Sequence, residues 1–135
     1  MLEKGFRAGG TILPSRFVKI TGDSTVEQTG AGETIFGISQ EFSRDVPVDV
    51  IPASGVNAAI LDDQIRVFGQ ADVCLLDVDG SGGAITAGQT LKSDANGRGI
   101  SLGVVATDET GAIALEGATT LGALIRVQVN IDTNN

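Results

Sequence analysis

Histidine is absent from all 135 positions of the sequence. Imidazole is the commonest general base and the commonest metal-binding side chain in proteins. Its absence excludes the Ser-His-Asp and Cys-His arrangements of nucleophilic enzymes, together with the usual zinc sites. Cysteine occurs only once, so metal clusters held by several thiolates are excluded as well. We therefore expect no catalytic residue, no metal site and no cofactor.

The single cysteine, Cys74, lies in the apolar run ADVCLL and is predicted to be a buried, small hydrophobic residue. One cysteine cannot form an intramolecular disulfide, so folding does not depend on an oxidising compartment. No apolar run approaches the roughly 20 residues that a membrane helix needs. The first sixteen residues lack the apolar core of a signal peptide. We expect a chain that is made in a cytosol.

Positive charge is also scarce. Nine basic residues stand against seventeen acidic ones, which gives a net charge of −8 and an isoelectric point near 4.3. An acidic chain of this kind is repelled by nucleic acid and by anionic membrane surfaces. We expect neither nucleic acid nor a membrane among its partners.

Aromatic residues make up only 4% of the chain, against 41% for all hydrophobic residues. The core must therefore consist of Val, Ile, Leu and Ala, a composition that suits β-sheet. Nineteen glycines indicate many tight turns. No segment shows a convincing helical period, no repeat of 20–50 residues is evident, and apolar alternation recurs about every 8–12 residues. The predicted fold is all-β: a compact β-sandwich or small β-barrel.

The expected strands of the first half lie at residues 16–21, 25–29, 34–39, 46–50, 65–68 and 71–78, with residues 56–61 either a strand or a helical turn. Those of the second half lie at residues 84–86, 89–93, 99–107, 112–115 and 121–131. In the last strand, Ile125, Val127, Val129 and Ile131 are predicted to face inward. Gly37 suggests a bulge or a close backbone approach. Asp79-Gly80 and Asn96-Gly97 are expected to form tight turns with positive φ.

The first fifteen residues contain Gly9-Gly10, Pro14 and apolar residues without a period. We predict an extended N-terminal arm over residues 1–15, followed by one β-domain over residues 16–135. A disordered tail is the alternative, because chain ends are commonly loose. Phe6, Ile12 and Leu13 favour an arm that docks on a partner.

Pairs of carboxylates are the remaining candidates for chemistry. They are Asp62 and Asp63, Asp77 and Asp79, and Asp108 and Glu109. We interpret them as solvated turn residues, because aspartate favours turns and the sequence has few aromatics to bind a sugar. The segment DVDGSGG at residues 77–83 resembles the start of a calcium loop, but its twelfth position is Gly88 where an EF-hand has glutamate. A β-turn is the preferred interpretation.

Residues 84–94 (AITAGQTLKSD) resemble a strand-turn segment of lipoyl and biotinyl carrier domains. Those domains present a modifiable lysine at a hairpin tip. The nearest lysine here, Lys92, lies inside the strand predicted at residues 89–93. A carrier domain is therefore only a third hypothesis.

As a whole, the chain resembles the head decoration (capsid cement) proteins of tailed bacteriophages, the group described as DUF2190-like. The resemblance covers most of residues 15–131. It rests on IFGIS at residues 35–39, GQTLKSDANGRG at residues 88–99, GVVA at residues 103–106, and the closing strand at residues 124–129. These are patterns of glycine turns and strands, not an active site.

This resemblance implies a non-enzymatic protein of the virion, made in the host cytoplasm and bound to the outer surface of a phage head. It implies the major capsid protein as partner, contacts that stabilise neighbouring capsid subunits, and a homotrimer. In that setting we expect the arm to contact capsid or a neighbouring protomer through five residues, Phe6, Arg7, Ile12, Leu13 and Phe17. The alternative is a small β-domain of a tail fibre or adhesin that binds a glycan or other ligand.

Overall fold

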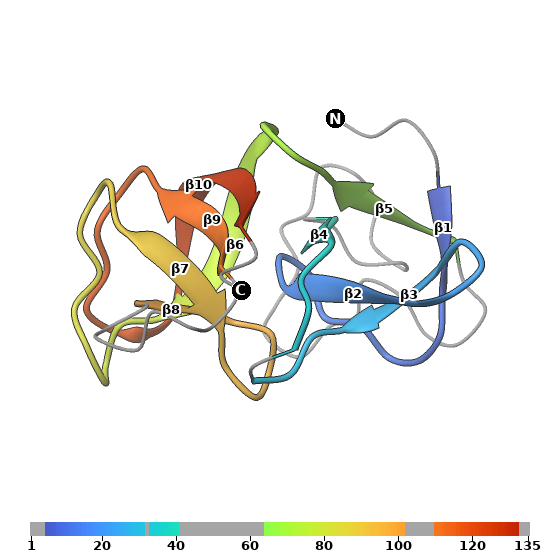
Figure 1. The fold of residues 1–135 in the computed structure, drawn as a ribbon. Helices are drawn as coiled ribbons and strands as arrows, with labels where there is room; N and C mark the ends of the chain where they lie inside the picture. Colours follow the sequence, from blue (N-terminus) through green and yellow to red (C-terminus); the bar gives the residue numbers. More distant parts are fainter. Residues whose placement is uncertain (1–4, 32, 41–63, 102–109, 133–135) are drawn as a thin grey trace, which may run out of the picture.

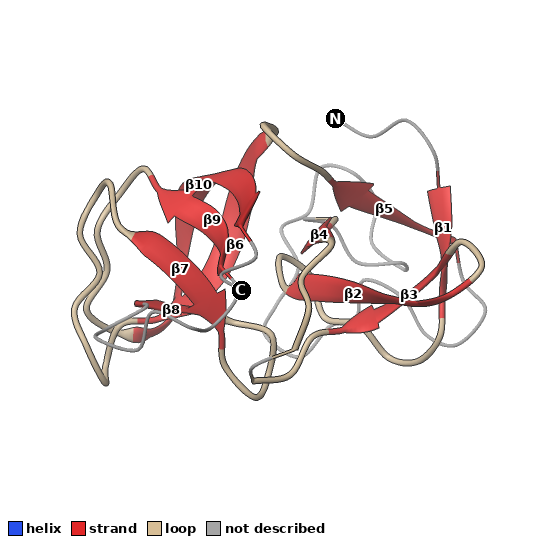
Figure 2. Cartoon of the chain, viewed as in Figure 1, coloured by secondary structure: helices blue, strands red, loops and turns tan. Residues whose placement is uncertain are grey.

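The structure is a computed structural model, and it describes residues 5–31, 33–40, 64–101 and 110–132. In these residues the chain forms ten β-strands and no helix (Figure 2), which confirms the predicted all-β fold. Within the same residues, no helix is long and apolar enough to cross a membrane. The strands predicted at residues 46–50 and 56–61 lie outside the described residues, and so do residues 102–107 of the strand predicted at residues 99–107. Four of the six paired carboxylates, Asp62, Asp63, Asp108 and Glu109, lie outside them as well.

The first five strands form a closed barrel, drawn in blue to green on the right of Figure 1. They are β1 (Gly5–Ala8), β2 (Phe17–Gly22), β3 (Thr25–Gln28), β4 (Gly37–Ser39) and β5 (Gln64–Phe68). Their order around the barrel is β1-β3-β2-β4-β5. The β1–β3 pair is parallel and the other four pairs are antiparallel.

The last five strands form a second closed barrel. They are β6 (Val73–Asp79), β7 (Thr90–Ser93), β8 (Gly99–Ser101), β9 (Thr110–Ala114) and β10 (Leu121–Asp132). Their order is β10-β6-β8-β7-β9. Here the β6–β8 pair is parallel and the others are antiparallel. The structure therefore has two small barrels, where the sequence predicted one β-sandwich or small β-barrel.

The two barrels have the same topology. Counted from the first strand of each, the cyclic order is first, third, second, fourth, fifth in both, and the first strand runs parallel to the third in both. The first strands begin at Gly5 and Val73. The structural repeat is therefore longer than the 20–50 residues over which a sequence repeat was sought. The molecule contains two copies of one β-barrel connectivity.

The N-terminal segment corrects the expectation of an extended arm. Residues 5–8 form β1, in which Arg7 pairs with Thr25 of β3 and Phe6 pairs with Ile65 of β5. The side chain of Ile12 is completely buried. The segment closes the first barrel because its apolar side chains are removed from water there. The fold thus has no boundary between an arm and a domain at residue 15.

Alternation along β6 and β10 builds the core of the second barrel. Ile125, Val127 and Val129 of β10 are buried as predicted, while Ile131 is half-buried. Cys74 is only 4% exposed, which confirms its prediction as a buried residue. Opposite faces of one strand differ in this way because successive side chains of a β-strand point to opposite sides.

The glycines of two turns are required for different reasons, and the sequence predicted only one of them correctly. Gly97 has a φ of 77°, as predicted for the Asn96-Gly97 turn. Gly80 lies outside the positive-φ region, so the prediction for Asp79-Gly80 is wrong. Gly80 is needed for a close approach instead, because an added Cβ would lie 2.5 Å from the carbonyl oxygen of Ala118. Residues 84–86 form only an isolated bridge, between Ile85 and Ala118, rather than a strand.

Gly37→Ala tests the close backbone approach at β4. An added Cβ would collide with the carbonyl oxygen of Phe68 and lie 2.6 Å from Cγ1 of Val67. Overpacking of this kind costs about 1–3 kcal/mol, so we expect the free energy of unfolding in urea to fall by that amount. Gly82→Ala is the control, because nothing lies within 4 Å of its added Cβ. An equal stability for both variants would contradict the packing at Gly37.

The segment that connects β5 to β6 is hydrogen-bonded to the C-terminal part of β10. The N–H of Ala71 donates to the carbonyl oxygen of Val129 at 2.7 Å, and the N–H of Val129 donates to that of Asp72 at 2.8 Å. Phe17, Ile35 and Ile38 of the first barrel belong to the same apolar cluster as the buried residues of the second barrel. The two barrels therefore share a core across their junction and pack as one unit.

Candidate interaction surfaces

The junction contains an ionic cluster centred on Asp77 of β6. Its Oδ2 lies 3.1 Å from Nη2 of Arg16, and its Oδ1 lies 3.0 Å from Nε of Arg98. Nη1 of Arg16 also donates to the carbonyl oxygen of Asn96 at 2.8 Å. Burial lowers the pKa of Arg16, and the charge of Asp77 opposes that shift. Arg16 precedes β2 of the first barrel, while Asp77 and Arg98 belong to the second barrel. This ionic cluster therefore connects the two barrels.

Asp77→Asn tests whether this ionic cluster stabilises the junction of the barrels. The variant leaves two arginines side by side without their shared anion, and the side chain of Arg16 is only 7% exposed. Removing one partner of a fully buried pair costs about 3–5 kcal/mol, and partial exposure of Arg98 lowers our expectation to about 2–3 kcal/mol. The measurement is thermal unfolding. Asp23→Asn, in an exposed turn, is the control, and equal melting of both variants would show that the cluster does not hold the barrels together.

Asp79 lies at the start of the segment predicted as a β-turn. Its Oδ1 accepts hydrogen bonds from the hydroxyl of Ser81 at 2.5 Å and from the N–H of Ser81 at 2.9 Å. These two hydrogen bonds lower the pKa of Asp79, the hydroxyl having the larger effect. The carboxylate of Asp79 thus closes a local turn with Ser81. Asp77 lies within β6 with its side chain only 16% exposed, so its prediction as a solvated turn residue is wrong. Among the described residues, no group of three His, Cys, Asp or Glu side chains is placed to hold a metal ion.

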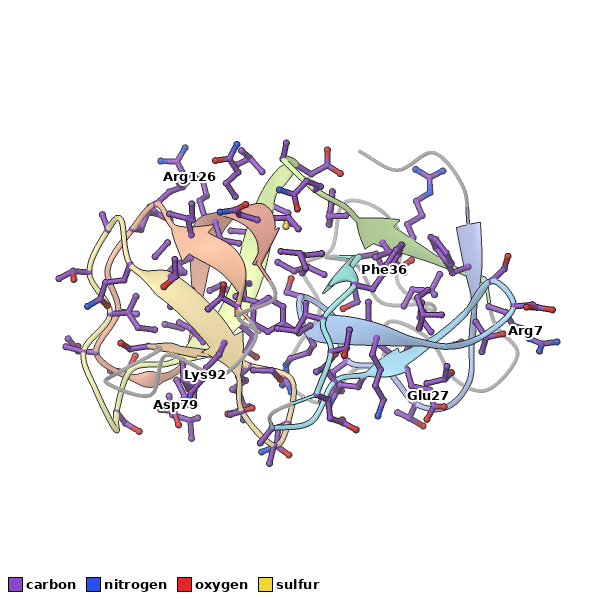
Figure 3. All side chains as sticks on the ribbon, viewed as in Figure 1. Arg7, Glu27, Phe36, Asp79, Lys92 and Arg126 are labelled. Atoms are coloured by element: carbon purple, nitrogen blue, oxygen red, sulfur yellow. The ribbon has the colours of Figure 1, made fainter. Side chains whose placement is uncertain are left out.

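Lys92 lies in the middle of β7, where it pairs with Ile100 of β8, and it is half-buried. Figure 3 shows it on the body of the second barrel and not at a loop tip. This position differs from that of the modifiable lysine in carrier domains, so no observation favours the carrier hypothesis.

Two of the five predicted contact residues lie in the interior. Ile12 and Phe17 are both completely buried, Ile12 in the core of the first barrel and Phe17 in the core shared at the junction. Gly111 packs against the ring of Phe17, since an added Cβ there would lie 2.7 Å from its Cε1. Neither side chain is accessible to a partner while the barrels are folded.

The other three predicted contact residues are at least partly accessible. Phe6 is half-buried and packs edge-on against Phe36, with ring centroids 5.2 Å apart. Arg7 is exposed at the end of the first barrel that lies away from the second (Figure 3), and Leu13 is half-buried. The N–H of Leu13 donates to Oε1 of Gln28 at 3.0 Å. The structure therefore does not assemble the five residues into one contact surface.

A different surface carries most of the exposed apolar side chains. Of the five large hydrophobic residues exposed in the described chain, four lie on or beside β6, β9 and β10: Val73, Leu115, Leu121 and Leu124. The fifth, Ile20, lies on β2. This surface was not predicted from the sequence. The signal was present, because Leu124 has the same outward parity in its strand as Arg126 and Gln128.

Comparison with known proteins gives a likeness at the level of fold. No family model matches the chain, and no curated protein matches it in sequence. A solved structure described as the head fiber gp8.5 N base of bacteriophage phi29 is similar over 94% of this chain and 92% of that one, with 19% identity and a TM-score of 0.53. The double-barrel fold of this chain is therefore shared with the N base of that head fibre.

Proposed function

We propose that this protein is a non-enzymatic structural protein of a phage head. The observation that carries the proposal is the fold likeness to a head-fibre base along nearly the whole chain. The sequence agrees with it, since it has no histidine and one cysteine, and Cys74 is buried. These features suit a protein that acts by binding.

The finer proposal is that the protein decorates the outer surface of the capsid and stabilises contacts between major capsid protein subunits, as a homotrimer. A protein that binds only the assembled shell stabilises it by mass action. Contacts repeated by the symmetry of a shell add avidity to weak individual binding. Both barrels are closed, so we propose contacts through side chains in place of strand addition by the N-terminal segment.

The proposal is tested with purified protein and heads of the phage that encodes it, prepared without this protein. We expect the protein to co-sediment with the heads and to raise the temperature at which they release DNA. Size-exclusion chromatography with light scattering reports whether it is a trimer before attachment. Failure to co-sediment, combined with binding on a glycan array, would replace this proposal with the adhesin alternative.

A further inference from the structure

The outer face of β9, β10 and β6 has a regular arrangement that the strand register defines. Leu115 follows β9 and its N–H donates to the carbonyl oxygen of Arg126, which in turn pairs with Leu75 of β6. On one side of this row, Ile113 pairs with Gln128, and Gln128 pairs with Val73. On the other side, Leu124 pairs with Asp77. We call the side chains of Val73, Leu75, Ile113, Leu115, Leu124, Arg126 and Gln128 the β10 face.

The β10 face is open to solvent although most of it is aliphatic. Val73 is 55% exposed, Leu124 is 51% exposed and Leu115 is 42% exposed. Exposed apolar side chains gathered on one face commonly mark an interaction site, whereas scattered single ones do not. The inward residues of the same strands are buried, so the face is the outer side of a packed barrel wall.

Arg126 lies at the centre of this face. Its side chain is 65% exposed and points away from the barrel (Figure 3). Glu116 is near, but its Oε1 accepts the backbone N–H of Arg126 at 2.7 Å and lies 3.8 Å from the guanidinium Nε. The carboxylate thus accepts a backbone hydrogen bond and forms only a long ion pair with Nε, while the guanidinium remains largely exposed to solvent.

We propose that the β10 face is the surface by which the protein docks on the phage head, and that Arg126 binds a carboxylate set in an aliphatic surface of the shell protein. This inference rests on the proposed function. Arginine is enriched among the residues that dominate binding energy at interfaces, and the contacts around such residues act by excluding water. Guanidinium binds carboxylate with two parallel hydrogen bonds, which fixes orientation as well as affinity.

Charge complementarity favours the shell over a second copy of this chain. A two-fold contact through the β10 face would bring its central Arg126 against the Arg126 of the other copy. A partner with a carboxylate at the centre of an apolar surface does not meet this obstacle.

The test uses two variants of the β10 face, Arg126→Glu and Leu124→Asp, with Arg7→Glu as the matched control. Arg7 is an exposed arginine at the far end of the first barrel, in the segment that the sequence predicted to make the contact. Each full-length protein is titrated onto heads that lack it, and its dissociation constant is measured at two salt concentrations. We expect both face variants to bind at least about tenfold more weakly, and the control to bind like the parent chain. Raising salt should weaken the parent chain but change Arg126→Glu little.

Each other outcome has a definite meaning. Parent-like binding by both face variants would overturn the inference and leave the proposed function standing. A parent chain that does not bind heads would remove the proposed function and this inference together. If analytical centrifugation shows that the parent chain self-associates, and both variants are monomers that still bind heads, the face binds a second copy and the inference is wrong.

Discussion

A chain that lacks residues 1–13 is expected to lose the first barrel. The deletion removes β1, which pairs with both β3 and β5, and it removes the buried side chain of Ile12. Truncating one buried isoleucine already costs about 2–5 kcal/mol, and opening the barrel adds to that cost. We expect a loss of more than about 5 kcal/mol, which is comparable with the whole stability of many domains.

The measurement is urea unfolding followed by circular dichroism, with Thr11→Ala as the control. Thr11 is exposed, so its truncation should change the free energy of unfolding by less than about 0.5 kcal/mol. A truncated chain that unfolds at the same urea concentration as the full chain would restore the interpretation of residues 1–15 as a dispensable arm.

Val127→Asp is expected to unfold the second barrel. Val127 is completely buried on β10 and pairs with Cys74 on one side and Ala114 on the other. A carboxylate at this position would have neither water nor a cation, so we expect a loss of more than about 4 kcal/mol at neutral pH. Thermal unfolding measures the effect. Gln128→Asp, one residue further on the outward side, should melt close to the parent chain.

This variant also makes a prediction about pH. Burial raises the pKa of a carboxyl group in the folded state above its value in the unfolded state. The folded variant then binds more protons than the unfolded one, so its stability rises as pH falls through the raised pKa. The difference in melting temperature between Val127→Asp and the parent chain should therefore shrink on acidification. A difference that is constant with pH would show that the introduced carboxyl group is not buried.

The sequence predicted local structure well where alternation was strong. The inward residues of β10 and the burial of Cys74 were predicted, because period-two patterning and an apolar context determine them. The strand pairs that close each barrel were not predicted, because they join segments that are distant in the sequence. β1 contacts β5 across most of the first half of the chain, and nothing in its own four residues, GFRA, specifies that partner. Phe6 and Ile12 were interpreted as exposed anchors for the same reason.

The β10 face could not be predicted from the sequence for the same reason, since it also depends on pairing between distant strands. Arg126 and Leu124 are neighbours on one strand and were visible in the sequence, but Leu75, Val73 and Leu115 join them only through the register of β10 with β6 and β9. The repeated topology was also hidden, since both barrels share a strand order without an evident sequence repeat. Residue patterns indicated strands, and only the assembled sheets show which outward side chains form one face.

The most direct test of the account is an electron-microscopy map of heads incubated with the purified protein. We expect double-barrel density on the outer surface of the shell, with β9, β10 and β6 against the capsid. Heads without added density would contradict the proposed function. Density in which the β10 face is open to solvent would contradict the assigned docking surface.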